Sequence, residues 1–367
     1  MDKRAKIQKE ASNAIKDNRY KGIVEVSPRV GKCKITIDAL SNIKKEIKVL
    51  IVAPKVDIFT DWKTEIVKWK LNPKVTVEYV WSNSLKKIKD TYHLIIADEI
   101  HEYNAKVLGQ LKLHQNKGSR ILGLTGTLDN FTEFHLQNTL QIAPIYTYSI
   151  DQAIKDKIIS DYRIYCIECE LDDQDKYVIA GTEDNMFLQT EKQAYSYWNS
   201  RYEKAVTQRK YSSLKFLMSK RKEIIYNSKT KIKVAQKLID KTDRCLIFTG
   251  FQKVADQLGE AAFHSKSNKL NLTKFKDGII NKLATVSMIS MGVTINDLKV
   301  SIFNQLKSGE NLAVQQAMRT MNKEDDKMAF IYIIYLKGTR DEEWLKSALK
   351  GFNLKKINYC TINDIKI

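Results

Sequence analysis

The first 150 residues alternate between two hydrophobic patterns. Short apolar runs typical of buried strands occur at GIVEV, VLIVAP, VTVEYV, YHLIIADE and RILGLTGT. Between two of them, DIFTDWKTEIVKW has apolar residues at intervals of four, four and three, the spacing of one helix face: Ile58, Trp62, Ile66 and Trp69. Strands separated by helices predict a parallel sheet covered by helices, with ligands at the carboxyl ends of the strands.

A second region with the same alternation begins near residue 228. KIKVAQKLI and KVADQLGEA predict helices there, and RCLIFTG, KLATVSMIS, VSIFN and AFIYIIYL predict strands. Before it, YRIYCIECELD predicts one strand, and residues 175–222, rich in Lys, Tyr and Ser and without Pro, predict helix. We therefore expect an α/β chain with a first lobe at 1–150, a linker strand and helical insertion at 151–227, and a second lobe at 228–367.

Charge points to the kind of partner. The chain has 62 Lys and Arg against 43 Asp and Glu, a net charge of +19, which favours a polyanion, nucleic acid before membrane. A lysine-rich solvated surface is the alternative. The longest apolar runs, such as MAFIYIIYL, are too short to cross a membrane, so we expect a cytoplasmic protein. Cys166 and Cys169 are three residues apart on a predicted strand and would face opposite sides, which argues against a shared metal.

The stretch SPRVGKC resembles a phosphate-binding loop with one part exchanged. Gly31 and Lys32 lie between a predicted strand and a predicted helix, where backbone N–H groups and a lysine can hold phosphates. The full pattern is not met, because Val26 stands at the first glycine position and Cys33 at the hydroxyl position. Mg²⁺ prefers oxygen ligands, so a thiol would not bind it as a hydroxyl does.

Two carboxylates at the end of a later strand strengthen the case for this loop. In LIIADEIH, Asp98 and Glu99 follow an apolar run that lies downstream of Lys32. One carboxylate there can hold Mg²⁺ through water, and the next can orient and deprotonate an attacking water. The pairing predicts a site that hydrolyses a nucleotide with the help of Mg²⁺.

Taken together, these features resemble superfamily 2 helicases of the DExH type, and SPRVGKC is similar to phage UvsW-like branch-migration helicases. Further matches follow in order: VLIVAPKVDIFTDWKTEIVKW (motif Ia), VWSNSLKKI (Ib), DEIH (II), GLTGT (III), CLIFTGFQKVADQL (IV), TVSMISMGVTINDLKVSIF (V) and AVQQAMRTMN (VI). The resemblance covers most of the chain. It implies two tandem RecA-like lobes, each a parallel sheet flanked by helices, joined by a helical connector.

The resemblance also implies roles for particular residues. ATP would be bound by Gln8, Arg29, Val30, Gly31, Lys32, Cys33 and Gly292, with Gln8 contacting adenine. Catalysis would use Lys32, Asp98, Glu99, Gln315 and Arg319, with Asp98 holding Mg²⁺ through water. Coupling between hydrolysis and movement would use His101, Thr125 and Thr127. Nucleic acid would be contacted by Pro54, Lys55, Ser84, Lys86, Thr249 and Gly250.

Aromatic residues offer a further means of contact with bases. Trp81, Tyr195, Tyr197 and Trp198 could stack on them, although core packing is the other interpretation. Motif VI departs from the family, because Met318 replaces a glycine and Asn322 replaces the second arginine.

We expect an ATP-dependent helicase or translocase that acts as a monomer on nucleic acid, DNA before RNA and single-stranded or branched, in the host cytoplasm if the chain is viral. An ATP-gated clamp or annealing factor with little turnover stays open as an alternative, as does an RNA helicase or a motor subunit of a larger complex.

Overall fold

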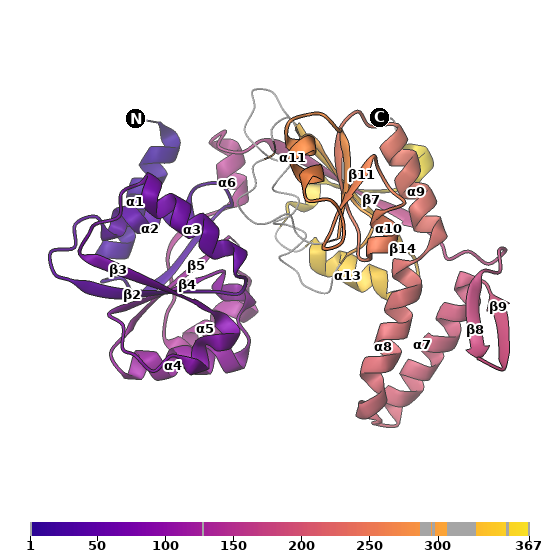
Figure 1. Ribbon diagram of the computed structural model, residues 1–367, viewed down its shortest axis with the longest axis horizontal. Helices are drawn as coiled ribbons and strands as arrows, with labels where there is room; N and C mark the ends of the chain where they lie inside the picture. Colours follow the sequence, from indigo (N-terminus) through magenta and orange to yellow (C-terminus); the bar gives the residue numbers. More distant parts are fainter. Residues whose placement is uncertain are drawn as a thin grey trace. The chain divides into compact units, whose positions relative to one another are not determined.

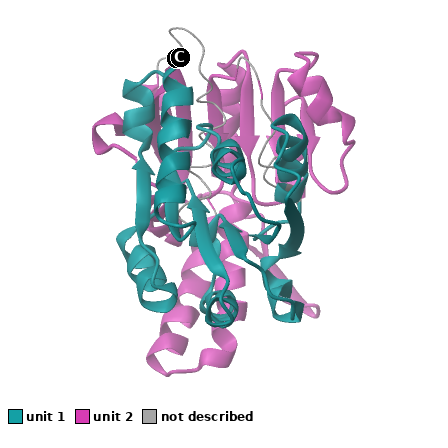
Figure 2. Cartoon of the chain, turned by 90° about the vertical axis from the view of Figure 1, so that its left-hand side faces the viewer, with its two compact units in different colours: residues 1–160, 290–294 teal, residues 161–289, 295–367 magenta. Residues whose placement is uncertain are grey.

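The computed structural model describes residues 2–126, 128–286, 295, 298–306, 328–349 and 352–365. Its described parts divide into two compact units, one of residues 2–160 and one that begins at Asp161 (Figures 1 and 2). In the described ranges, none of the helices is both long and apolar enough to cross a bilayer. Each unit contains its own parallel sheet, as the alternation of strands and helices predicts.

The first unit holds a six-stranded sheet in the order β3-β2-β4-β5-β1-β6, with all pairs parallel. Its strands are β1 (Gly22–Val26), β2 (Ile47–Ala53), β3 (Val75–Trp81), β4 (Leu94–Asp98), β5 (Arg120–Thr125) and β6 (Pro144–Tyr148). Its helices are α1 (Lys3–Asp17), α2 (Lys32–Leu40), α3 (Asp57–Lys68), α4 (Ala105–Asn116), α5 (Asn130–Leu140) and α6 (Ile150–Lys155), with 3-10 turns η1 (Ser82–Lys87) and η2 (Ile100–Glu102).

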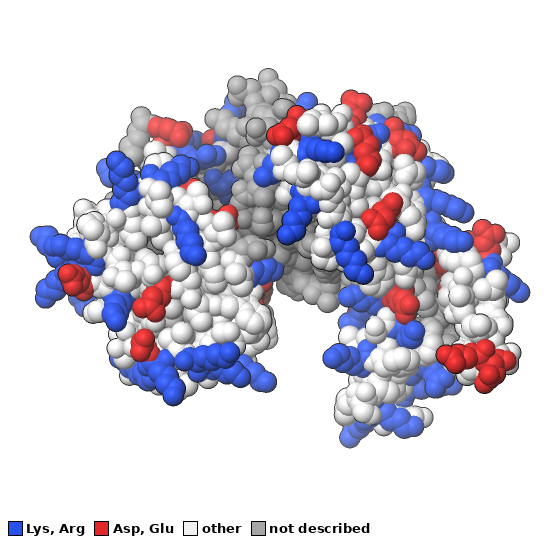
Figure 3. Space-filling model, in the orientation of Figure 1, with Lys and Arg blue, Asp and Glu red and all other residues white. Residues whose placement is uncertain are grey.

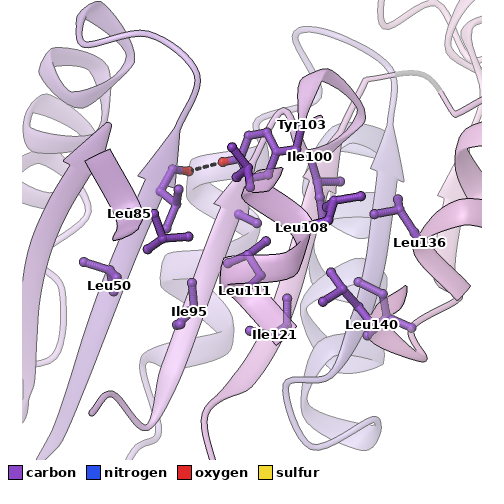
Figure 4. Close-up of a cluster of buried hydrophobic side chains, with 14 of the residues drawn as sticks. Leu50, Leu85, Ile95, Ile100, Tyr103, Leu108, Leu111, Ile121, Leu136 and Leu140 are labelled. Carbon is purple, nitrogen blue, oxygen red and sulfur yellow. Dashed lines mark hydrogen bonds between the residues drawn. The ribbon is translucent and has the colours of Figure 1, made fainter. Parts of the chain in front are cut away.

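The central strands of this sheet are apolar throughout because helices cover both faces. On one face, Leu50 and Ile95 pack in a cluster with Leu108 and Leu111 of α4 and Leu136 of α5, all buried (Figure 4). The continuous apolar runs at β2, β4 and β5 therefore form strands where the sequence predicts them. Because all the strands run in parallel, their carboxyl ends lie on one edge, where the loops after β1 and β4 meet.

The second unit holds a seven-stranded parallel sheet in the order β11-β12-β10-β13-β14-β7-β15. Its strands are β7 (Asp161–Cys169), β10 (Cys245–Phe248), β11 (Ala261–Phe263), β12 (Lys282–Thr285), β13 (Val300–Phe303), β14 (Met328–Leu336) and β15 (Ile357–Cys360). Its helices include α9 (Lys229–Asp240), α10 (Gln252–Ala255), α11 (Leu270–Lys276) and α13 (Arg340–Ala348), with η3 (Leu354–Lys356) and η4 (Ile362–Asp364).

Strand β7 belongs to this second sheet. It pairs with β14 along its whole length, from Asp161 to Cys169, and β15 pairs with its other side. Cys166 and Cys169 are both buried free thiols on this strand. The stretch that the sequence suggests is a linker strand is therefore part of the core of the second unit.

The inserted segment begins with strands, so the helix predicted from residue 175 is wrong at its start. Residues 178–189 form an antiparallel hairpin of β8 (Val178–Thr182) and β9 (Asn185–Gln189), with Glu183 and Asp184 as its two-residue turn. Gly181 supports this hairpin with a φ of +97°. Two apolar runs around a two-residue polar turn are the signal that was missed. Helices α7 (Glu191–Thr207) and α8 (Tyr211–Tyr226) follow, as predicted.

Candidate active site

The loop between β1 and α2 has the backbone of an anion-binding turn. Gly31, at the N-terminus of α2, has a φ of +103°, and a side chain there would come within 2.8 Å of the Gln8 amide nitrogen. Arg29 also has a positive φ, +72°, while burial and the neighbouring Arg4 lower the pKa of its guanidinium to about 10. Helix α2 begins at Lys32, so its first N–H groups face the loop, where they can bind phosphate.

Gln8 comes from α1 and lies against this loop. Its side-chain amide donates a hydrogen bond to the Val30 carbonyl oxygen at 2.7 Å. The proposed adenine-contacting residue is thus next to the phosphate loop, although it is far from it in sequence.

Lys32 meets both acidic residues of DEIH. The loop after β1 and the end of β4 come together because only β5 separates the two strands in the sheet. The Lys32 ammonium forms an ion pair with Glu99 and lies 3.8 Å from Asp98 Oδ1. Burial opposes the charge on Lys32, but the two carboxylates together outweigh burial and raise the pKa of this ammonium.

Asp98 is held in a fixed orientation by two donors. Its Oδ1 accepts the Glu99 backbone N–H at 3.0 Å, and its Oδ2 accepts the indole N–H of Trp62 at 2.8 Å. Burial raises the pKa of Asp98, and Lys32 opposes that rise. Glu99 itself has a left-handed backbone, with a φ of +49°, which turns the chain away from the strand at this point.

Trp62 lies on α3 and is a site residue that the sequence analysis missed. It belongs to the apolar stripe of DIFTDWKTEIVKW, and only 1% of it is exposed. A buried tryptophan usually finds an acceptor for its N–H, but the sequence does not say which one. We infer that Trp62 is a positioning residue for Asp98.

Replacing Trp62 tests this role. In Trp62→Phe, Asp98 loses a donor to its charged form, so its pKa rises and the acidic limb of the turnover–pH profile moves to higher pH. A hydrogen bond to a charged group contributes about 1.5 kcal/mol or more, so turnover at neutral pH should fall about tenfold. Trp69→Phe is the matched control, since Trp69 directly follows the last residue of α3 and its indole N–H donates to Glu65 at 2.6 Å, not to Asp98. Equal pH profiles for both variants would contradict the role.

His101 joins this cluster to the end of β5. Its Nδ1 lies 2.8 Å from the Thr125 hydroxyl and 3.5 Å from Glu99 Oε2. Burial, helped by the charge of Lys32, lowers the pKa of His101 to about 3, so the ring is neutral at physiological pH. Its Nε2 is buried and has no hydrogen-bond partner within the described part of the chain. The predicted coupling residues His101 and Thr125 are thus in contact.

Cys33 fits poorly as a metal ligand. Burial, followed by the charge of Asp98, raises the pKa of its thiol well above the ordinary value, so the group is neutral. A neutral thiol does not supply the hard oxygen that Mg²⁺ prefers. The residues present therefore fit a magnesium ion held through Asp98 and water, without direct help from Cys33.

Two further residues fix the shape of the site. The Tyr103 hydroxyl lies within hydrogen-bond distance of the Val52 carbonyl oxygen (2.8 Å) and the Asp98 carbonyl oxygen (3.0 Å), which ties β4 to β2. Gly126 follows β5, and a side chain there would meet the Pro28 ring at 3.4 Å. This is an ordinary van der Waals distance, so the end of β5 lies close to the phosphate loop and a small side chain would also fit there.

The predicted nucleic-acid residues of the first unit share one edge of the sheet. Pro54 and Lys55 follow β2, while Ser84 and Lys86 lie in η1 after the neighbouring strand β3. Trp81 connects the two segments, because its indole N–H donates to the Pro54 carbonyl oxygen at 2.9 Å and its side chain is exposed. The structure brings the segments of motifs Ia and Ib together.

In the second unit, the predicted residues are engaged in internal hydrogen bonds. Thr249 is buried, and its hydroxyl donates to the Phe251 carbonyl oxygen at 3.3 Å. The Gly250 N–H donates to the side-chain oxygen of Gln305. Tyr195 is buried, with its hydroxyl accepting the Arg340 N–H at 2.9 Å. Contact of Thr249 and Gly250 with nucleic acid stays a prediction.

Comparison with known proteins extends this picture. No protein-family model matches the chain. The chain is 23% identical to the DNA 3'-5' translocase XPB2 of Sulfurisphaera tokodaii, over 91% of this chain and 82% of that protein. It superimposes on S. cerevisiae Dbp5 bound to RNA and ADP BeF3 with a TM-score of 0.60, at 10% identity, over 98% of this chain and 90% of that one. The chain is therefore similar in sequence to a DNA translocase and in fold to Dbp5.

The chain also shares its fold with the Hef helicase domain of Pyrococcus furiosus. That structure has a TM-score of 0.53 and 13% identity, over 95% of this chain and 97% of that one. The prediction of two tandem RecA-like lobes is confirmed. Four of the residues predicted for the helicase site, Thr127, Gly292, Gln315 and Arg319, lie outside the described residues, as do Met318 and Asn322. Their roles stay predictions.

Proposed function

We propose that this protein is a helicase, an ATP-driven motor that moves along or unwinds nucleic acid, with DNA as its preferred substrate. One observation carries the proposal: Lys32 forms an ion pair with Glu99 and lies beside Asp98, at a phosphate loop that begins helix α2. A lysine, two strand-end carboxylates and helix N–H groups are the parts that phosphoryl transfer needs. The relative named as a DNA 3'-5' translocase supports DNA as the substrate and this direction of movement.

The contacts suggest how the residues of this site act in turn. With nucleotide bound, Lys32 would move from Glu99 to the terminal phosphates, and Glu99 would become free to orient an attacking water and accept its proton. Bound Mg²⁺ would neutralise phosphate charge, held through water by Asp98, which the indole of Trp62 keeps in place. His101 contacts both Glu99 and Thr125, so it can pass a change at Glu99 to the end of β5.

Finer parts of the proposal rest on the motifs. The sequence Asp98-Glu99-Ile100-His101 supports a DExH-type helicase, and SPRVGKC supports a likeness to phage branch-migration helicases. Branched DNA is the substrate that this likeness favours. In the second lobe, we propose that Gln315 and Arg319 contact ATP and that Thr249 and Gly250 contact the strand.

Steady-state ATP hydrolysis tests the proposed function. Phosphate release should rise when single-stranded or branched DNA is added to the wild-type protein, and less with RNA. Lys32→Ala should abolish both the basal and the stimulated rate, because the variant loses the group that grips the phosphates. A wild-type rate equal to that of Lys32→Ala under every condition would contradict a motor.

Cys33 motivates the second candidate function, an ATP-gated clamp with little turnover. Its neutral thiol stands where a hydroxyl would bind Mg²⁺ directly. The same assay with Cys33→Ser separates the two functions. A motor shows stimulated turnover with Cys33 in place, whereas a clamp shows ATP-dependent strand binding without turnover until serine restores the oxygen ligand.

A further inference from the structure

The inserted segment is made of two parts with opposite charge. Residues 170–190, which include the β8–β9 hairpin, contain six Asp and Glu and one Lys. Residues 191–226, which form α7 and α8, contain nine Lys and Arg and three Glu. In Figure 3, blue side chains accordingly gather over the α7–α8 region and red ones over the hairpin beside it. A polyanion would be attracted to the helices and repelled by the hairpin.

Three aromatic rings lie together across α7 and α8. The Tyr197 and Trp198 rings are 5.0 Å apart, and Trp198 lies 5.8 Å from Phe216 on the second helix. Both ring pairs meet edge to face. Tyr197 is 47% exposed and Phe216 is 55% exposed, so much of two rings is open to solvent. Core packing alone does not require this exposure.

Cations accompany these rings. The Arg201 guanidinium lies 5.5 Å from the centre of the Tyr197 ring and 5.9 Å from that of Trp198, and it donates to the Tyr197 hydroxyl at 2.6 Å. Lys220 Nζ lies 5.9 Å from the centre of the Phe216 ring. Lys220 also pairs with Glu223 at 3.2 Å, and the neighbouring Arg221 is buried and donates to Asn199 at 2.6 Å. We call Tyr197, Trp198, Arg201, Phe216 and Lys220 the aromatic–cationic strip.

We propose that the aromatic–cationic strip is a second contact for nucleic acid and takes unpaired bases of a single strand. Exposed rings offer faces on which any base can stack, and neighbouring cations attract the phosphates on either side. An acidic partner protein would complement the positive charge of the helices, but it would offer no bases to stack on the exposed ring faces. The inference rests on the proposed function, which it extends from motifs Ia and Ib to the insertion.

Hydrogen bonds fix the base of this helical pair to the second lobe. Tyr226 ends α8, and its hydroxyl donates to the Leu306 carbonyl oxygen at 2.8 Å. The Gln305 side chain donates to the Tyr226 carbonyl oxygen and accepts the Gly250 N–H. The side-chain amide of Gln305 therefore binds both the end of α8 and the loop of motif IV. A strand on the aromatic–cationic strip would be carried with the loop whenever the second lobe moves.

The test compares two exposed phenylalanines in surroundings of opposite charge. Phe216→Ser should weaken binding of the full-length protein to fluorescein-labelled oligothymidylate at least about fivefold in fluorescence anisotropy, the loss of one stacked base. Phe216→Tyr keeps a ring and should bind as wild type does. Phe187→Ser, in the acidic β8–β9 hairpin and 50% exposed, is the matched control and should not change binding. Affinity for blunt duplex DNA should be nearly unchanged in all variants.

Each other result has a definite meaning. Wild-type affinity for the oligonucleotide in Phe216→Ser, or an equal loss of affinity in Phe187→Ser, would overturn the proposal. A protein partner would then be the better candidate for the strip. An equal loss for blunt duplex would overturn it too, since paired bases cannot stack on the strip. ATP turnover without DNA, measured in the same samples, should not change. If the wild-type protein binds the oligonucleotide but hydrolyses no ATP, the proposed motor function is refuted and the proposed role of the aromatic–cationic strip is not. If it does not bind the oligonucleotide, both are refuted.

Discussion

Glu99→Gln is expected to abolish steady-state ATP turnover while ATP binding is retained. Glutamine has nearly the same shape but cannot accept a proton from water, and the loss of a general base costs about a hundredfold to ten-thousandfold in rate. The substitution also leaves Lys32 with Asp98 as its carboxylate neighbour in the described site. Because Glu99 raises the pKa of Asp98, that pKa should fall in the variant.

The measurement is phosphate release, with binding of a fluorescent ATP analogue in parallel. Glu102→Gln is the control, since Glu102 is an exposed carboxylate three residues further along the same turn. It should lose little turnover. Wild-type turnover in Glu99→Gln would refute the assignment of the catalytic base, and loss of ATP binding would mean that Glu99 mainly holds the site together.

Lys231→Met is expected to destabilise the second unit by about 3–5 kcal/mol. Lys231 of α9 and Asp341 of α13 form an ion pair with a 2.5 Å N–O distance, and both side chains are buried. Asp341 also accepts the Leu336 N–H at 3.1 Å, which ties the helix to the end of β14. Without Lys231, a carboxylate would remain buried without compensation. Breaking one partner of such a pair costs far more than losing an exposed one.

The effect should depend on pH with a defined sign. Burial raises the pKa of Asp341 in the folded protein, and Lys231 opposes this rise. Its removal raises the pKa further, so the folded variant binds more protons than the unfolded chain does. Its stability therefore falls as pH rises above the unfolded value of about 3.9, and the deficit relative to wild type shrinks on acidification.

Hydrogen exchange of peptides from α9 and β14 in increasing urea would measure this loss locally. Lys337→Met removes an exposed lysine that lies 2.8 Å from Glu168, so it should cost less than about 1 kcal/mol. Lys231→Met/Asp341→Asn keeps an acceptor for Leu336 and should recover much of the stability. A deficit in Lys231→Met no larger than that in Lys337→Met would show that the buried pair contributes little.

Local patterns revealed much of the fold and part of the site. Strands such as β2 and β4 are predictable because both of their faces are covered, so each is a continuous apolar run. Lys32, Asp98 and Glu99 are predictable because their chemistry depends on short motifs. Trp62 and Tyr103 are not, because their roles depend on which atoms lie opposite them in the folded unit. The β8–β9 hairpin was missed because both of its faces are exposed, so its strands lack the usual alternation.

The state of the thiols has a practical consequence. All five cysteines have a pKa above the ordinary value, chiefly through burial, and those of Cys166, Cys169 and Cys245 are about 12. Alkylation and oxidation proceed through the thiolate, which is scarce in each of them. A new cysteine on an exposed position would therefore react first with a maleimide dye. The protein could carry a single fluorescent label for watching its steps, with every native cysteine left in place.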